Sequence, residues 1–247
     1  MFRMTNKKEC LEGSMVIGEL ALDGRVRHVN GVVAITAFAK QSGFSRIILP
    51  KENLAEANLI SDIEILPVNS LSEALSYFRG ENVIAPYDIP LEIPAARPMS
   101  SFQTATQNNH TEAFGDMDIC EIRGQQSVKR ALEIAAAGGH NILMNGPPGS
   151  GKTMLAQAMR SILPPMDFEE ALEVTRLYSL AGMLRRGNPL MTSRPFRRVH
   201  HTASAISITG GGAIPRPGEI SLAHRGVLFF DEVAEFPSSV LNVLRQP

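Results

Sequence analysis

Residues 141–155 have the sequence NILMNGPPGSGKTML, in which an apolar run gives way to a glycine-rich loop and then to a segment that carries Lys152 and Thr153. The loop satisfies the pattern G-x-x-x-x-G-K-[ST], whose small residues let consecutive backbone N–H groups surround phosphate oxygens. A helix that begins at such a loop directs the positive end of its dipole at the same anion. The stretch therefore predicts a strand, a phosphate-binding loop and a helix, and this context disfavours the alternative of a chance glycine turn.

The loop also predicts the ligands. Lys152 supplies a mobile cation for the β- and γ-phosphates, and the Thr153 hydroxyl is placed to ligate Mg²⁺. ATP and Mg²⁺ are therefore the expected cofactors. The expected nucleotide contacts in the loop are Gly146, Pro147, Pro148, Gly149, Ser150, Gly151, Lys152 and Thr153.

A second element ends in two carboxylates. Residues 226–232, GVLFFDE, predict a buried strand of a parallel sheet that ends at Asp231 and Glu232. We expect Asp231 to lie beside Thr153 and hold Mg²⁺, and Glu232 to orient and deprotonate a water that attacks the γ-phosphate. The expected catalytic residues are thus Lys152 and Glu232. A solvated turn at the end of a strand is the less favoured alternative.

Composition limits the possible class of protein. The chain has 247 residues, 44% of them hydrophobic, and a formal net charge of -1, so any binding to nucleic acid needs a local basic patch. Cys10 and Cys120 lack metal-site spacing, which favours a reducing compartment. Because no apolar run approaches the roughly 18 residues of a membrane span and the N-terminal residues MFRMTNKKEC lack the apolar region of a signal peptide, we expect a soluble, cytoplasmic protein without membrane contact.

The N-terminal part predicts a small α/β unit. Residues 16–30 alternate with period two around Asp23-Gly24, which favours an antiparallel hairpin. The patterns that follow predict helices over 31–40 and 70–78 and strands over 46–49 and 62–68. The second helix begins with the capping-box pattern of Ser70 and Glu73.

This unit resembles the later half of the Lon-protease-type domain, through the segments GELALDGRVRHVNGV, GFSRIILPKENLAEA and DIEILPVNSLSEAL. That family uses a Ser–Lys dyad, with the lysine just after a Gly-Gly that follows the hairpin. This chain has Asn30-Gly31-Val32-Val33 there and no lysine. The resemblance therefore implies a non-proteolytic unit that serves assembly or contact.

The chain is expected to have three parts. Residues 84–116 combine spaced prolines with the polar run TATQNNHTE, which is typical of a linker. The predicted parts are a domain over 1–83, this linker over 84–116, and a second domain over 117–247.

In the second domain a helix is predicted over 125–137, and the preceding IRGQ resembles the adenine-side contact of AAA+ ATPases. Asp167 is expected to cap a later helix.

An arginine-rich segment lies between the two nucleotide elements. Asp231 follows Lys152 by 79 positions (231 − 152), and no acidic residue occurs between Arg185 and His201. The segment fits contact with a phosphate backbone, or equally a solvated basic face or arginines that pair with acids of a neighbouring subunit. His200 and His201 are expected to point in opposite directions, which disfavours a zinc site. The candidate DNA contacts are Arg185, Arg186, Arg194, Arg197 and Arg198.

The stretch RPFRRVHHTASAISITGGGAIPRPGEISLAHRGVLFFDEVAEFP closely resembles the magnesium-chelatase-like AAA+ family, in particular its YifB/ComM competence type. That family couples a Lon-type domain, a linker and a chelatase-like AAA+ module in this order. Val199 departs from the proline usual before the two histidines. The implied fold is α/β: a partial Lon-protease-like domain linked to a partial P-loop AAA+ αβα domain without its lid.

The resemblance implies a ring-forming ATPase, by analogy a homo-hexamer. ComM-type members are DNA helicases that promote branch migration in natural transformation or recombination, whereas chelatase subunits use the motor to insert Mg²⁺ into protoporphyrin. The Lon-type unit favours the DNA role. Because a sensor residue, an arginine finger and the lid are expected beyond Pro247, we expect this apparently truncated chain to bind nucleotide with little turnover. An assembly module without turnover is therefore a third hypothesis, and a protease the least favoured.

Overall fold

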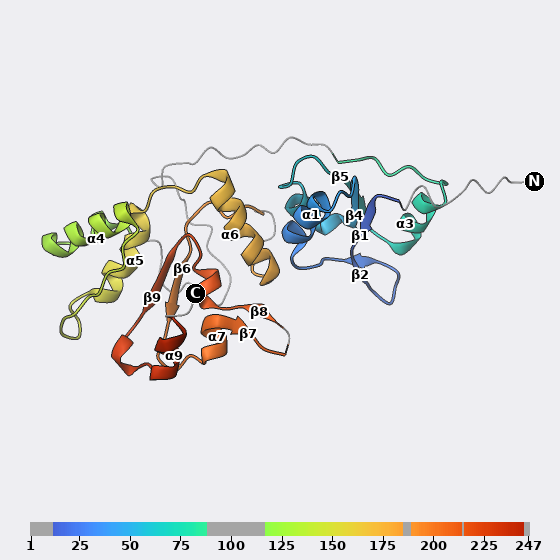
Figure 1. Cartoon of the computed structure of the whole chain (residues 1–247). Coiled ribbons are helices and arrows are strands. Elements are labelled where there is room, and N and C mark those ends of the chain that lie inside the picture. The colour runs from blue at the N-terminus through green and yellow to red at the C-terminus, as the bar shows by residue number, and fades with distance from the viewer. Residues whose placement is uncertain (1–11, 88–116, 185–188, 214, 245–247) are drawn as a thin grey trace, which may run out of the picture. The chain divides into compact units, whose positions relative to one another are not determined.

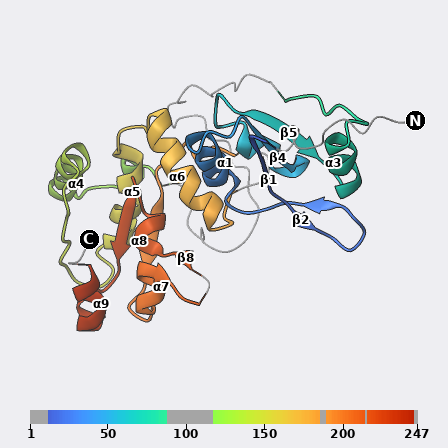
Figure 2. The same ribbon diagram turned by 45° about the vertical axis from the view of Figure 1, so that its right-hand side comes forward.

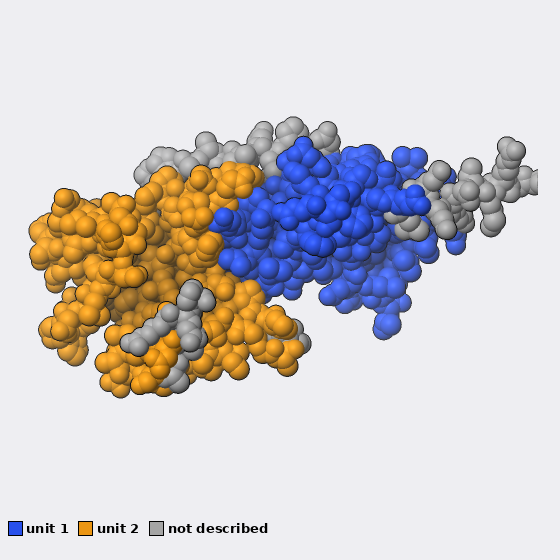
Figure 3. All heavy atoms as spheres, in the orientation of Figure 1, with its two compact units in different colours: residues 1–93, 172–191 blue, residues 94–171, 192–247 orange. Residues whose placement is uncertain are grey.

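The computed structural model describes residues 12–87, 117–184, 189–213 and 215–244. Contacts divide the chain into two compact units, unit 1 (residues 1–93 and 172–191) and unit 2 (residues 94–171 and 192–247), which Figure 3 shows in different colours. Each unit is a mixed α/β structure with parallel strand pairing. Most of the predicted linker, residues 88–116, lies outside the described residues.

Unit 1 is built on a three-stranded parallel sheet in the order β1-β4-β5 (Figure 1). Its strands are β1 (Ser14–Val16), β4 (Arg46–Pro50) and β5 (Glu64–Val68). Its helices are α1 (Val32–Gln41), η1 (Lys51–Asn53), α2 (Leu54–Ala57) and α3 (Leu71–Phe78). The helices predicted over 31–40 and 70–78 and the strands predicted over 46–49 and 62–68 are therefore confirmed.

Side-chain alternation along the strands gives this sheet two cores. Ile47 and Leu49 face a cluster that includes Val32 of α1 and Ala57 of α2. The intervening Ile48 faces a second cluster, with Leu66, Val68, Ala74 and Ile84. Because both faces of the parallel sheet are covered, β4 can be an almost uninterrupted apolar run.

The predicted hairpin is confirmed, with shorter strands than expected. β2 (Glu19–Leu20) and β3 (Val26–Arg27) pair antiparallel. Gly24 has φ +80° and its N–H donates to the Ala21 carbonyl at 2.9 Å, so the turn uses the backbone freedom of glycine. Val16, expected in the hairpin, pairs instead with Ile48 in the parallel sheet.

The segment 172–191 belongs to unit 1, although the sequence places it within the predicted domain over 117–247. Helix α6 (Phe168–Leu180) ends there. Its Ser179 hydroxyl donates to Glu56 Oε2 at 3.0 Å, and its carbonyl accepts from Gly31 N at 2.9 Å. The buried Glu56 is also bonded by His28 at 3.0 Å and Asn53 at 3.3 Å. These long-range contacts explain the assignment, and the domain ranges remain a prediction.

Unit 2 contains the parallel pair β6 (Phe196–Val199) and β9 (Val227–Phe230). A short antiparallel pair follows β6 in the chain, formed by β7 (Gly210–Gly211) and β8 (Arg216–Pro217). Figure 2 shows α8 (Glu219–Leu222) near α7 (Ala205–Thr209), with which it is in contact. The helices are η3 (Ile119–Glu121), α4 (Gln126–Gly138), α5 (Lys152–Ile162), α7 (Ala205–Thr209), α8 (Glu219–Leu222), η4 (Val233–Glu235) and α9 (Ser238–Val243).

One buried cluster in unit 2 places the helix that follows the glycine loop. Leu132 of α4 and Leu155 and Ala158 of α5 are almost fully buried in it, and Val227 at the start of β9 packs against it. Since Leu132 has no exposed surface, the cluster anchors α4 against α5. None of the helices in the described ranges combines the length and apolar character needed to cross a membrane.

We expect Leu132→Ala to lower the free energy of unfolding by about 2–5 kcal/mol, because it leaves a cavity between α4 and α5. The control is Ile134→Ala in the same helix, where the side chain is 53% exposed and the cost should stay within about 0.5 kcal/mol. Urea denaturation followed by circular dichroism measures both. Equal costs for the two variants would contradict the burial of Leu132 between α4 and α5.

Candidate functional site

The glycine loop ends where α5 begins. Gly151 is the N-cap of α5 with φ +83°, and Gly149 has φ +76°. Both values lie in the left-handed region, which glycine adopts without the steric cost of a side chain. A Cβ at either position would meet no atom within 4 Å. The loop is therefore open around these two glycines, and the first-turn N–H groups of α5 have no intrahelical acceptors, which suits an anion.

The lysine of the motif bonds to its own loop. Lys152 Nζ donates to the Gly146 carbonyl at 2.8 Å and to the Pro147 carbonyl at 2.9 Å. The ammonium group is thus held over the loop, at the place where the motif needs a cation. A bound phosphate can replace these two carbonyls as the acceptor for Lys152, because charged oxygens form stronger hydrogen bonds with an ammonium group than neutral ones do.

A strand was predicted before the loop, but residues 140–147 contain none. Ile142 and Met144 pack against the α4–α5 cluster, whereas Leu143 is 81% exposed. The segment thus has partly buried and exposed side chains in alternation, where an apolar strand was predicted, and a strand also needs a hydrogen-bonded neighbour. Among the described residues this segment belongs to none of the four sheets.

The acidic pair follows β9 as predicted, but this strand is half-buried where a buried one was expected. Its pairing with β6 continues one residue beyond the strand, since Asp231 N donates to the Val199 carbonyl at 3.2 Å. Glu232 has φ +55°, so the backbone turns sharply between the two acids and η4. Glu232 is therefore the residue at which the chain leaves β9 for η4.

Each acid contacts a side chain from β6 or the residues just after it. Arg198 Nη2 donates to Asp231 Oδ2 and forms an ion pair with it. His201 Nδ1 lies 3.5 Å from Glu232 Oε2. Strand β6 thus supplies a partner for Asp231, and the turn after it places His201 beside Glu232, which the sequence did not indicate.

The two histidines do not point in opposite directions as expected. The rings of His200 and His201 are 4.0 Å apart and inclined by 36°. The expectation assumed an extended chain, but β6 ends at Val199 and the chain turns, so consecutive side chains can lie on one side. His200 Nδ1 is 3.0 Å from Thr202 Oγ1, a short-range contact that stabilises this turn.

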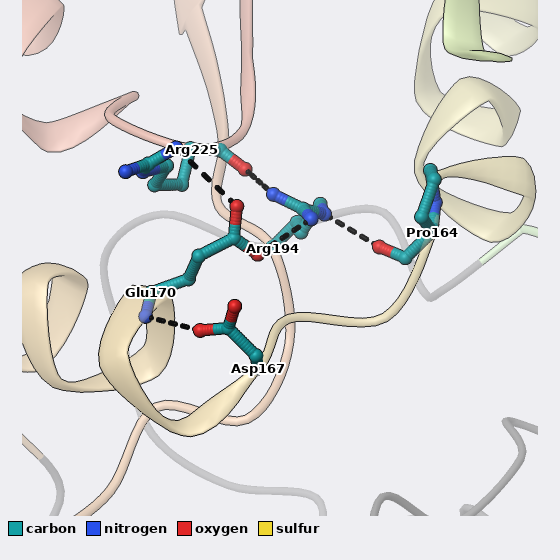
Figure 4. Close-up of polar contacts among 5 residues, drawn as sticks. All are labelled: Pro164, Asp167, Glu170, Arg194 and Arg225. Atoms are coloured by element: carbon teal, nitrogen blue, oxygen red, sulfur yellow. Dashed lines mark hydrogen bonds and ion pairs between the residues drawn. The ribbon is translucent and has the colours of Figure 1, made fainter.

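Arg194 occupies a network within unit 2 (Figure 4). Its guanidinium donates to Glu170 Oε2 at 2.9 Å and to the carbonyls of Pro164 at 2.6 Å and Arg225 at 2.7 Å. Arg225 Nη1 reaches Glu170 Oε1 at 3.3 Å, and Asp167 Oδ1 accepts from Glu170 N at 2.8 Å. This confirms the predicted Asp167 cap. It also gives Arg194 a structural role that no local pattern in the sequence indicates.

Arg197 is similarly engaged, since its Nη2 donates to Glu219 Oε1 at 2.8 Å and its side chain is only 10% exposed. Neither Arg194 nor Arg197 can contact a nucleic-acid phosphate without giving up a carboxylate. Their acidic partners, Glu170 and Glu219, belong to this same chain and not to a neighbouring subunit. Arg198 is 39% exposed and pairs with Asp231, and the other two candidates, Arg185 and Arg186, lie outside the described residues.

The carboxyl end of β9 and the amino end of α5 lie at the same end of unit 2 in Figure 1. The α4–α5 cluster, which includes Val227, couples the two elements. This arrangement is compatible with a cation shared by Thr153 and Asp231, which remains a prediction. The described residues contain no group of three or more His, Cys, Asp or Glu placed to hold a metal. Mg²⁺ does not require one, because it is usually held by one or two side chains, phosphates and waters.

A cavity of about 610 Å³ lies elsewhere, in unit 1. Its lining mixes both charge signs, with Arg27 and Lys51 beside Glu19 and Glu52. None of the phosphate-loop or acidic-pair residues lines it. We therefore place the candidate site at the loop in unit 2, on the chemistry of its residues.

Family models and related proteins both show similarity over most of this chain. Residues 118–247 match the model described as magnesium chelatase, subunit ChlI, and residues 1–53 match that of subunit ChlI of Mg-chelatase. The uncharacterized protein YifB of Salmonella typhimurium is 43% identical over 237 residues, 96% of this chain and 43% of the relative. The competence protein ComM of Haemophilus influenzae is 41% identical over 232 residues, 94% of this chain and 42% of the relative.

A more distant similarity covers part of the chain. The magnesium-chelatase 67 kDa subunit of Heliobacterium mobile is 29% identical over 156 residues, which is 52% of this chain and 23% of that subunit. The chain spans less than half the length of each of these three relatives.

We expect Arg194→Ala to lower the free energy of unfolding by about 2–3 kcal/mol, because it leaves two carbonyls and part of the Glu170 carboxylate without a donor. The matched control is Arg130→Ala, which removes an arginine that is 73% exposed and pairs with Glu133 within α4, and it should cost almost nothing. Urea denaturation compares the two. A cost for Arg194→Ala as small as that of the control would exclude a structural role.

Proposed function

This chain belongs to the magnesium-chelatase-like AAA+ family of the YifB and ComM proteins, and on that premise we propose that it is the nucleotide-binding part of an ATP-driven motor that acts on DNA. The observation that carries the proposal is the glycine loop at the start of α5, with Lys152 held over it by two carbonyls. An open, donor-rich loop with a displaceable cation fits the triphosphate of ATP.

Each site residue has a distinct part in the proposal. Lys152 moves from the loop carbonyls to the β- and γ-phosphates, which the loop amides surround. Thr153 and Asp231 are the residues that would hold Mg²⁺. When bound, the ion neutralises the charge that develops on the phosphoryl oxygens. Glu232 orients a water molecule toward the γ-phosphate and accepts its proton.

The choice of DNA as the partner rests on relatives and on sequence. The ComM relative is named a competence protein, and the Lon-type N-terminal segment favours the same branch of the family. We propose a DNA helicase that promotes branch migration, working as a homo-hexamer. Within the basic segment, Arg185 and Arg186 are the primary candidates for backbone contact, because Arg194 and Arg197 are engaged by Glu170 and Glu219.

A chelatase-type role is the second candidate. It is favoured by the 29% identity to a magnesium-chelatase subunit over 52% of the chain. The same nucleotide site would then power insertion of Mg²⁺ into a porphyrin. DNA-dependent and porphyrin-dependent stimulation of ATP hydrolysis distinguish the two roles.

We expect Lys152→Ala to weaken binding of a fluorescent ATP analogue by about tenfold or more, because the phosphates lose their charge-assisted donor. Fluorescence anisotropy in the presence of Mg²⁺ measures this affinity. Glu232→Gln should bind the analogue as the unaltered chain does, since this carboxylate is assigned to the chemical step only.

Lys51→Ala, an exposed lysine of unit 1, is the control for the removal of one positive charge and should leave the affinity unchanged. If the unaltered chain binds no analogue, or if Lys152→Ala binds as tightly as the control, the nucleotide-site assignment is wrong.

We expect the double variant Arg185→Ala/Arg186→Ala to weaken binding of single-stranded DNA by about tenfold near 0.1 M salt and to reduce the slope of log affinity against log salt by about 1.5. Titration of a labelled oligonucleotide at several salt concentrations measures both. Arg25→Ala/Arg27→Ala, in the hairpin of unit 1, removes the same charge and should have no effect. Equal losses from both double variants would show only a general charge effect.

A further inference from the structure

The ion pair between Arg198 and Asp231 places a cation of the protein on the carboxylate that the proposed function assigns to Mg²⁺. The guanidinium bonds to Asp231 Oδ2 directly. Asp231 is 21% exposed, so it keeps some access to solvent and to a ligand. A bound guanidinium and a divalent cation repel each other, so they cannot share this small carboxylate without loss of affinity.

The pairing of β6 with β9 places Arg198 beside Asp231. β6 and β9 run parallel with Arg198 opposite Phe229 and Val199 opposite Phe230. The hydrogen bond from Asp231 N to the Val199 carbonyl extends the pairing to the acid itself. Because the register fixes both backbones, Arg198 is presented to Asp231 by the sheet and not by a loop.

Arg198 differs from its neighbours in how firmly it is held. The side chains of Arg194 and Arg197 are 15% and 10% exposed, and each forms several hydrogen bonds. The Arg198 side chain is 39% exposed, and its contact with Asp231 is a single ion pair. Partly exposed pairs of this kind are weak. Of the three, Arg198 is the arginine that a competing cation can displace at small cost.

From these observations we infer that Arg198 is a built-in competitor of Mg²⁺ for Asp231: it neutralises the carboxylate before the metal–nucleotide complex arrives and must leave it when the cation binds. The inference rests on the proposed nucleotide site and adds a regulatory residue to it. Arg198 sets the Mg²⁺ concentration at which the site fills. It makes no contribution to nucleotide binding without metal.

The test is a Mg²⁺ titration at a fixed concentration of the fluorescent ATP analogue, read by anisotropy, which measures binding and not turnover. We expect Arg198→Gln to lower the half-saturating Mg²⁺ concentration by about two- to fivefold, the effect of removing a weak competing ion pair. Affinity for the analogue in EDTA should be unchanged. Arg130→Gln on α4 removes the same charge and should leave the midpoint where it is.

A double-mutant cycle separates the contact from a general charge effect. In an Asp231→Asn background, Arg198→Gln should cause no further shift of the Mg²⁺ midpoint, because its partner is already neutral. Arg198→Lys, which keeps the charge on a shorter and less directional donor, should lie between the unaltered chain and Arg198→Gln. If Arg198→Gln fails to fold, the Mg²⁺ midpoint of Arg198→Lys still tests the inference.

Two results would overturn the inference. One is an unchanged midpoint for Arg198→Gln in a chain that still binds the analogue through Lys152. The other is weaker binding of the analogue with and without Mg²⁺, which would make Arg198 a phosphate contact. Loss of Lys152-dependent binding in the unaltered chain would instead refute the proposed function, so the two failures are distinguishable.

Discussion

The candidate site depends on the parallel pairing of β6 with β9. Val199 and Phe230 are opposite each other, and the pairing extends to the Asp231 amide. This register brings the Arg198 side chain to Asp231 and places the histidine turn beside Glu232. A shift of one residue would reverse the faces on which the side chains of β6 project and separate these groups. The chemistry of the two acids is therefore set by an adjacent strand, about 30 residues earlier in the sequence.

The arginine-rich segment does not form a freely exposed basic surface, because some of its arginines pair with acidic residues of the same chain. Arg194 and Arg197 each use a carboxylate from another element, Glu170 and Glu219. An arginine that is nearly buried needs such a partner, because an unpaired buried charge is costly. The positive charge of the segment is thus partly used to hold α6 and α8 in place. Only the remaining arginines can be considered for an external partner.

Unit 1 also contains a buried charged group whose partners come from distant parts of the sequence. Glu56 is buried and accepts hydrogen bonds from His28, Asn53 and Ser179, which come from three separate parts of the chain. A buried carboxylate with several donors favours one arrangement of the segments around it. This network, and not proximity in the sequence, is why the end of α6 belongs to this unit.

Local patterns in the sequence determined the elements whose causes are local. The glycine turn at Asp23-Gly24, the caps at Ser70 and Asp167, the helix after the loop and the strand before Asp231 were all predicted, because each depends on residues within a few positions. Tertiary structure alone decided the rest. Whether residues 142–144 form a strand depends on a hydrogen-bonding neighbour, and the role of each arginine depends on acids more than 20 positions away. No spacing rule encodes such distant partners, since only the folded chain brings them together.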